Sequence, residues 1–132
     1  MGLDHSLYAV IPDQKEQPEA YFRKKWAIFI YCNTHCKTVS DENKDDKYSL
    51  DYEIVSAEDI RHLVQLCRRL LLFRNLLSFP QIAHRYLPEV HEYDPFGSDY
   101  GKSYIYGLEQ AIEQLTPILE MNPIHFGHSW SN

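Results

Sequence analysis

The chain has 132 residues, of which 44% are hydrophobic and 14% aromatic, and it carries 19 acidic against 13 basic residues for a net charge of −6. This composition argues against intrinsic disorder, and the length fits one domain over residues 1–132. No run of about 18 apolar residues is present, which excludes a membrane-spanning helix, and the first residues lack the pattern of a secretory signal. The acidic total argues against nucleic acid as the main partner, and three cysteines fit reduced thiols in a cytoplasmic protein.

The first quarter of the chain predicts a strand followed by a helix. Residues 3–11 are β-prone and stop at Pro12, which indicates the strand. From residue 19 to about residue 37 we expect one long helix, because four apolar side chains follow at helical spacing: Phe22, Trp26, Phe29 and Ile30. The β-branched Ile28 and Ile30 lower its helical propensity, so a strand over residues 26–32 is the alternative.

The middle of the chain predicts a polar loop, a short strand and the clearest helix. Residues 38–53 indicate a solvated loop, with a short strand at residues 52–55. Ser56 has the hydroxyl of a helix N-cap, and Glu58 and Asp59 favour the positive end of the helix dipole. The buried stripe of this helix consists of Ile60, Leu63, Val64, Cys67, Leu70 and Leu71. Beyond it we expect the helix to continue, apolar nearly all round, until Pro80 ends it.

The last third predicts a loop, a helix and a strand. Prolines and glycines over residues 80–103 indicate a long loop or irregular hairpin. A third helix is expected over residues 103–121, kinked or shortened by Pro117. Apolar residues then alternate with polar ones from Ile124 to Trp130, which predicts a C-terminal strand. The expected fold is α+β, with three helices packed on one face of a small, mostly antiparallel sheet built largely from the chain ends.

Short segments spread over nearly the whole chain, as far as Ser129-Trp130, carry a family resemblance. They are Met1-Gly2-Leu3-Asp4, Tyr21-Phe22-Arg23-Lys24, Val55-Ser56-x-Glu58-Asp59-Ile60, Leu66-Cys67, Gly97-Ser98-Asp99-Tyr100 and Leu108-x-x-x-Ile112-x-Gln114-Leu115. In this order they resemble a family of small bacteriophage and prophage proteins. Members of that family are mostly of unknown function, so the resemblance implies a biological setting rather than a reaction.

The chain departs from the family pattern in the predicted first helix. Family members often read Arg-Lys-Ala-Asn-Ala-Ile-His-Lys-Trp there, whereas this chain has Trp26 and Phe29 at the Asn and His positions. An activity that depended on those two polar groups would be missing from this protein. An apolar surface takes their place.

Two clusters contain groups that bind metals, and neither is complete. Cys32, His35 and Cys36 offer thiols and an imidazole, but a structural zinc site usually has four ligands and no second cysteine pair exists. The segment His91 to Asp99 offers an imidazole and carboxylates in a glycine- and proline-containing loop. Ordinary thiols and solvated acids are the simpler interpretation, so we expect no metal, no cofactor and no enzymatic activity. A metal-dependent enzyme or metal-binding module at either cluster is the alternative.

Charge is strongly segregated along the chain. Six carboxylates lie between residues 41 and 53, whereas residues 60–88 contain five arginines and no acid: Arg61, Arg68, Arg69, Arg74 and Arg85. The basic face could contact an acidic protein surface or phosphates, and the acidic stretch could imitate nucleic-acid phosphates. The alternative is that these two regions pair with each other or are only solvated.

Together these observations predict a phage-encoded, non-enzymatic protein that binds a host protein in the bacterial cytoplasm. The specific form that we expect is an inhibitor of a bacterial immune complex, of the anti-CRISPR kind. A homodimeric scaffold joined through Leu72, Phe73 and Leu76 is a further alternative. Candidate partner-binding residues are Asp41, Glu42, Asp45, Asp46, Arg61, Arg68, Arg69, Tyr93, Tyr100, Tyr104 and Tyr106.

Overall fold

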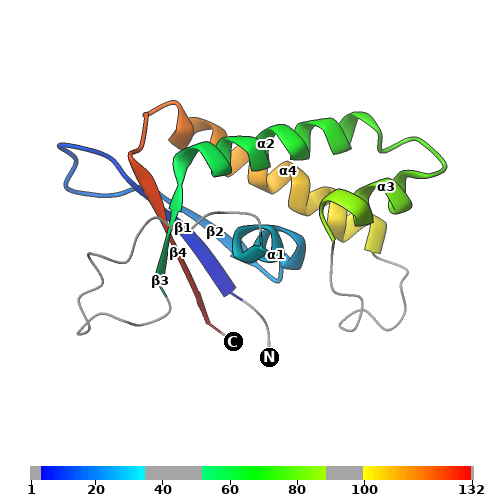
Figure 1. The fold of residues 1–132 in the computed structure, drawn as a ribbon, viewed down its shortest axis with the longest axis horizontal. Coiled ribbons are helices and arrows are strands. Elements are labelled where there is room, and N and C mark those ends of the chain that lie inside the picture. The colour runs from blue at the N-terminus through cyan, green and yellow to red at the C-terminus, as the bar shows by residue number, and fades with distance from the viewer. Residues whose placement is uncertain (1–3, 35–51, 89–99, 132) are drawn as a thin grey trace.

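The computed structural model describes residues 4–34, 52–88 and 100–131, which form helices on a four-stranded antiparallel sheet (Figure 1). The strands are β1 (Asp4–Val10), β2 (Glu19–Arg23), β3 (Tyr52–Ser56) and β4 (His125–Ser131), and their order in the sheet is β2-β1-β4-β3. The first and last strands therefore lie side by side at its centre. This arrangement confirms the predicted α+β class and the sheet built from the chain ends.

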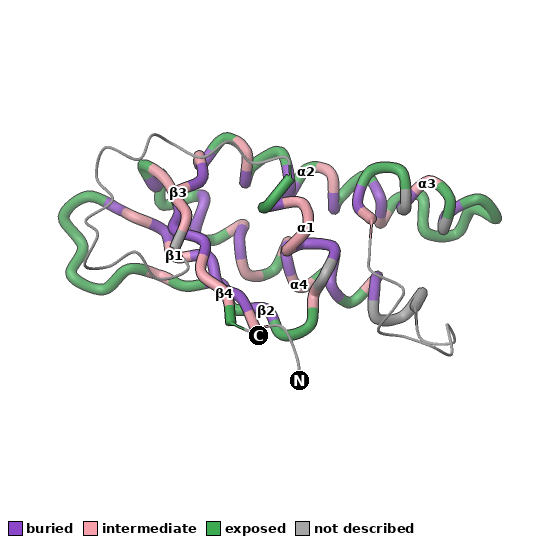
Figure 2. Tube along the Cα trace, turned by 60° about the horizontal axis from the view of Figure 1, so that its bottom comes forward, coloured by how far each residue is buried: buried purple, intermediate pink, exposed green. Residues whose placement is uncertain are grey.

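The strand register places one row of buried side chains on the side of the sheet that the helices cover. Leu7 of β1 lies opposite Ala20 of β2 and His128 of β4, and Val55 of β3 lies opposite Phe126 of β4. Residues directly opposite each other in a sheet project from the same face. All five are buried, and Figure 2 shows these buried stretches lying together where the strands meet the helices.

The predicted long helix over residues 19–37 is wrong in its first half. Residues 19–23 form β2, an edge strand with Ala20 and Phe22 buried, and the helix α1 covers Trp26–Thr34. Lys24 separates the two elements with a φ of 56°, in the left-handed region that breaks both strand and helix. Of the two alternatives for residues 26–32, the structure shows the helix.

The second helix, α2, confirms its predicted start and inner stripe. It covers Ala57–Leu72, and the hydroxyl of Ser56 accepts a hydrogen bond from the backbone N–H of Asp59 at 3.0 Å. This is the predicted N-cap. Its inward residues are buried, and α2 packs along α4 (Tyr100–Leu119). Figure 1 shows that α2 and α4 are antiparallel. Both extend from the sheet to the opposite end of the molecule, where α3 lies.

The prediction that this helix continues to Pro80 is wrong. The helix α2 ends at Leu72, and a separate helix, α3, covers Phe79–Tyr86 within the region expected to be a loop. Pro80 lies in the first turn of α3, where its missing N–H removes no helical hydrogen bond. Proline therefore begins a helix here, and the described residues contain four helices rather than three.

Candidate functional site

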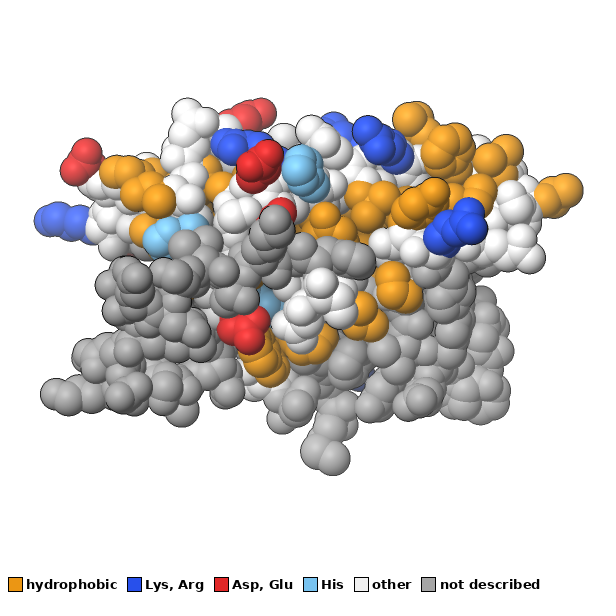
Figure 3. All heavy atoms as spheres, viewed as in Figure 1, with side chains coloured by type: hydrophobic (Ala, Val, Ile, Leu, Met, Phe, Trp, Pro, Cys, Tyr) orange, Lys and Arg blue, Asp and Glu red, His pale blue; other side chains and the backbone are white. Residues whose placement is uncertain are grey.

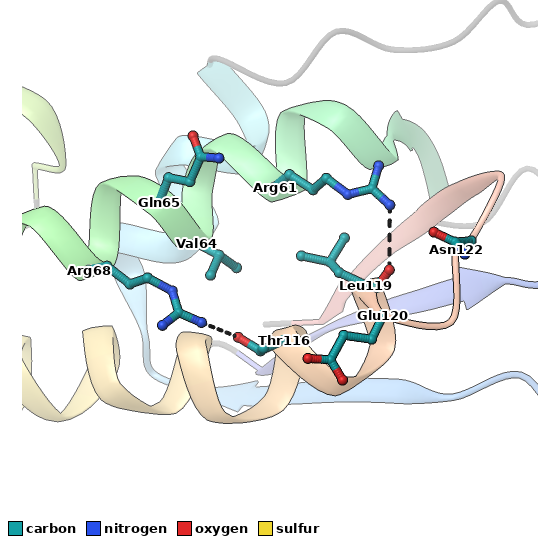
Figure 4. A pocket seen from close by; sticks show the side chains of 8 residues that line it. All are labelled: Arg61, Val64, Gln65, Arg68, Thr116, Leu119, Glu120 and Asn122. Atoms are coloured by element: carbon teal, nitrogen blue, oxygen red, sulfur yellow. Dashed lines mark hydrogen bonds between the residues drawn. The ribbon is translucent and has the colours of Figure 1, made fainter.

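The described residues form a groove between α2 and the C-terminal end of α4 (Figure 4). Its volume is about 340 Å³, and it is lined from α2 by Arg61, Val64, Gln65 and Arg68, and from the other side by Thr116, Leu119, Glu120 and Asn122. The floor is apolar, because Val64 and Leu119 are buried, whereas the rims are polar. The structure therefore combines an apolar base with groups that recognise charge, as binding sites commonly do.

Two arginines are held over this groove by contacts with α4. An Nη of Arg61 donates to the carbonyl oxygen of Leu119 at 3.4 Å, and an Nη of Arg68 donates to Oγ1 of Thr116 at 3.0 Å. Each bond engages one of the five N–H donors of a guanidinium. Among the described residues, Glu120 is the one acid that lines the groove, so the described walls carry two positive charges against one negative. The groove is therefore suited to an anionic group.

Large apolar side chains are exposed next to the groove, at the far end of α2. We call this surface the apolar tip; it consists of Leu72, Phe73, Leu76, Leu77 and Tyr86. Leu72 is 81% exposed and Leu77 is fully exposed. Figure 3 shows hydrophobic side chains gathered over this end of the molecule, with basic side chains among them. Large exposed apolar patches are a common feature of interaction sites.

The structure separates the candidate residues into three groups. Arg61 and Arg68 line the groove, and Arg69 is exposed on the same helix. Tyr106 is exposed elsewhere on α4, where its ring lies 4.7 Å from Nζ of Lys25. Asp41, Glu42, Asp45, Asp46 and Tyr93, and the side chain of Tyr100, lie outside the described residues, so pairing of the acidic stretch with the arginines stays untested.

Tyr104 belongs to the core rather than to a binding surface. Its side chain is 2% exposed, and its hydroxyl donates to the carbonyl oxygens of Ala83, at 3.2 Å, and Leu87. It therefore fastens α3 to α4 and cannot contact a partner. The sequence contained the signal for this, because Tyr104 precedes Leu108, Ala111 and Leu115 at the spacing of the buried stripe.

The predicted metal clusters are mostly beyond the described part of the chain. Cys32 is buried in α1, whereas His35, Cys36 and residues 91–99 are not described. Within the described residues, no group of three or more His, Cys, Asp or Glu side chains could hold a metal ion. None of the described helices has the length and apolar composition that crossing a bilayer requires.

Sequence reasoning missed a buried pair of histidines beneath α1. His5 of β1 and His128 of β4 are almost fully buried, with Nδ1 of His5 3.3 Å from Nε2 of His128. The rings of Phe22 and Phe29 pack against His5, and that of Trp130 packs against His128. The period-two alternation of both strands puts these histidines on the inner face, which was the available signal. The pair lies in the core, so it acts on stability rather than at a surface site.

Comparison of the chain with protein-family models, with curated proteins and with solved structures finds no match. The class of the protein therefore follows from its own geometry: an α+β fold with a basic groove and an exposed apolar tip on one helix pair.

Proposed function

We propose that this chain is a non-enzymatic interaction protein of phage or prophage origin, which binds a host protein through the groove and the apolar tip. The observation that carries the proposal is the exposure of the apolar tip. Burying a leucine side chain contributes roughly 1.5–3 kcal/mol, so several exposed leucines on one surface offer a large gain to any partner that covers them. The resemblance to phage proteins supports the biological setting.

The neighbouring groups fit a protein partner. Arginine and aromatic side chains are enriched among the residues that dominate binding energy at interfaces, and here Arg68, Arg69 and Phe73 lie on the same helix end. Aliphatic side chains with a charged rim resemble the core and rim of a protein–protein interface. The specific form that we propose is inhibition of a bacterial immune complex in the host cytoplasm, of the anti-CRISPR kind.

Capture from a bacterial lysate tests this proposal. Tagged wild-type protein is compared with Leu77→Glu, which charges the apolar tip, and with Ile124→Glu, which charges an exposed side chain just before β4. We expect a host protein that is retained by the wild type and by Ile124→Glu and lost with Leu77→Glu. If every protein captured by the wild type is also captured by Leu77→Glu, the apolar tip is not the binding surface.

The same exposed side chains favour a second candidate, the homodimer predicted through Leu72, Phe73 and Leu76. Light scattering separates the two, because a monomer has the chain mass of 15.6 kDa and a dimer has twice that mass. A dimer that Leu77→Glu converts to a monomer would support the scaffold.

A further inference from the structure

We infer that the groove and the apolar tip form one continuous surface for an acidic amphipathic helix of the partner, an inference that rests on the proposed function. The two features lie along a single line of α2. Arg61, Gln65, Arg68 and Leu72 occupy positions i, i+4, i+7 and i+11, which share one face of a helix. At 1.5 Å per residue this line is about 16 Å long, the length of about three turns of a bound helix.

The shape of this surface suits a helix. The part of this line from Arg61 to Arg68 is bounded on one side by the C-terminal end of α4, with Thr116 and Leu119, so that α2 and α4 form the two walls of a groove there (Figure 4). Proteins that bind amphipathic helices use a groove of this kind with an apolar strip along it. Here the apolar side chains that an occupant can cover are Leu72 and Leu77 at the apolar tip, whereas Val64 and Leu119 form the buried floor of the groove.

The charges select an acidic occupant. Arg61 and Arg68 line the groove, whereas Arg69 and Arg74 lie outside its lining. Residues 60–88 contain no acid. Helical spacing then predicts the occupant's pattern. Carboxylates seven residues apart would span the two groove arginines, because Arg61 and Arg68 are separated by about 10.5 Å along the helix axis. Apolar side chains one turn further along would cover Leu72.

Two other occupants fit this surface less well. A second copy of this chain would form an isologous interface, in which each apolar tip meets its own equivalent and the surrounding arginines are brought together. Like charges placed opposite each other across an interface oppose association. A nucleic acid would satisfy the arginines, but its phosphate backbone has no side chains to cover the exposed Leu72 and Leu77.

Binding of two synthetic peptides to the full chain tests the inference. Both peptides are helical, with leucine at positions i, i+3, i+4 and i+7 and so on, and their remaining positions are glutamate and alanine in one peptide and lysine and alanine in the other. Affinity is measured by calorimetry, and the site is mapped by perturbation of backbone amide NMR signals. We expect the glutamate peptide to bind at least tenfold more tightly than the lysine peptide, with perturbations along α2 and residues 116–122.

Variants assign the effect to the proposed surface. Arg68→Glu and Leu72→Glu, both at exposed positions, should each weaken the glutamate peptide at least tenfold. Arg23→Glu is the matched control, because it reverses an exposed arginine on β2, and it should change the affinity by less than twofold. Circular dichroism of each variant verifies that the fold is kept.

Several results would overturn the inference. Equal affinity for the two peptides, perturbations elsewhere, or tighter binding of a 20-nucleotide single-stranded DNA at the same residues would each contradict it. So would a dimer that Leu72→Glu dissociates, because a second copy would then cover the surface. If neither peptide binds while Leu77→Glu still loses a host protein in the lysate experiment, the acidic helix is wrong and the proposed function stands.

Discussion

The protons of the buried histidine pair can be assigned from its hydrogen bonds. A carbonyl oxygen only accepts, so Nε2 of His5, 3.3 Å from the carbonyl oxygen of Lys25, carries a proton. In a neutral ring Nδ1 of His5 is then an acceptor, and Nε2 of His128 donates to it. This leaves Nδ1 of His128 as a buried acceptor with no hydrogen-bond partner among the described residues. Burial lowers the pKa of both imidazoles, which favours the neutral rings, and a further proton would introduce a buried charge.

This arrangement predicts that acid destabilises the protein from an unusually high pH. Burial lowers the pKa of His5 to about 4, against the raising effect of the Lys25 carbonyl, and burial with the neighbouring His5 lowers the pKa of His128 to about 3. Both folded-state pKa values lie below the ordinary histidine value of 6.5, so the unfolded chain binds protons first. The free energy of unfolding should be largest above pH 6.5 and fall on the order of a few kcal/mol between pH 6.5 and 3.

Urea denaturation at a series of pH values measures this dependence. The variant His128→Phe, which removes one buried imidazole at similar volume, should flatten the profile between pH 6.5 and 4. The control His125→Gln changes a half-buried histidine on the opposite face of β4 and should keep the wild-type profile. An unfolding free energy that is constant over this range in the wild-type protein would show that the pair is protonated without cost.

The buried thiol of Cys67 gives a second prediction for single residues. Its side chain is fully buried in α2, and burial raises its pKa to about 12. Because the thiolate is the reactive form, Cys67 should resist iodoacetamide at pH 8 in the folded protein and react when urea unfolds it. Peptide mapping by mass spectrometry follows this residue separately from the other cysteines. Rapid labelling of Cys67 without denaturant would mean that α2 opens readily.

Elements that depend on local spacing were predictable, and those fixed by distant contacts were not. The periodic stripe of α2 and the Ser56 cap follow from neighbouring residues, and both are confirmed. The strand β2 was missed because Phe22 also fits the helical spacing that starts the next element. Its strand conformation is fixed by pairing with β1 and by a side chain 93 residues away, which no local pattern contains.

That side chain is Gln114 of α4, which closes the outer edge of β2. Its amide oxygen accepts from the backbone N–H of Tyr21 at 2.8 Å, and its amide nitrogen donates to the Tyr21 carbonyl oxygen at 2.8 Å. Gln114→Leu should therefore lower the free energy of unfolding by roughly 1–3 kcal/mol, because the two hydrogen bonds between this side chain and the backbone of Tyr21 are lost. It should also promote association through the uncovered edge.

Chemical denaturation and light scattering of this variant measure both effects. The matched control is Glu113→Leu, which places the same side chain on the neighbouring, exposed position of α4. This control should change the unfolding free energy by about 0.5 kcal/mol or less. Equal stability of the two variants would show that the edge of β2 needs no cover.

The candidate site shows the same division between local and distant information. Its arginines were predicted from the acid-free run over residues 60–88. The opposite wall comes from Thr116, Leu119 and Glu120, about 50 residues further along the chain, and only the packing of α2 on α4 brings them together. The exposed leucines were expected to lie in a longer helix. The early end of α2 at Leu72 instead places Leu76 and Leu77 in the turn before α3.

At the scale of the whole molecule, the net charge of −6 describes the binding face poorly. Every basic residue of α2 is an arginine, and the acids of this helix, Glu58 and Asp59, both lie in its first turn beside the sheet. Beyond its first turn, α2 therefore carries arginines and apolar residues and no acid, whereas the acids of α4 are Glu109 and Glu113. This polarity is what makes an acidic partner better suited than a second copy.

Introducing a charge into the apolar tip distinguishes a docking surface from a part of the core. A charge on a docking surface leaves the free energy of unfolding nearly unchanged, whereas a charge in the core lowers it. Leu72 and Leu77 contribute little to the core because they are exposed, so the double variant Leu72→Glu/Leu77→Glu should keep the unfolding free energy within about 1 kcal/mol of wild type. It should also bind less of the dye ANS, which detects exposed apolar surface. By contrast, Leu63→Ala removes a fully buried side chain of the same helix and should cost about 2–5 kcal/mol. Thermal denaturation and dye fluorescence measure both properties. A loss of stability in the double variant as large as that of Leu63→Ala would mean that these leucines hold the fold together, and the apolar tip would then be no docking surface.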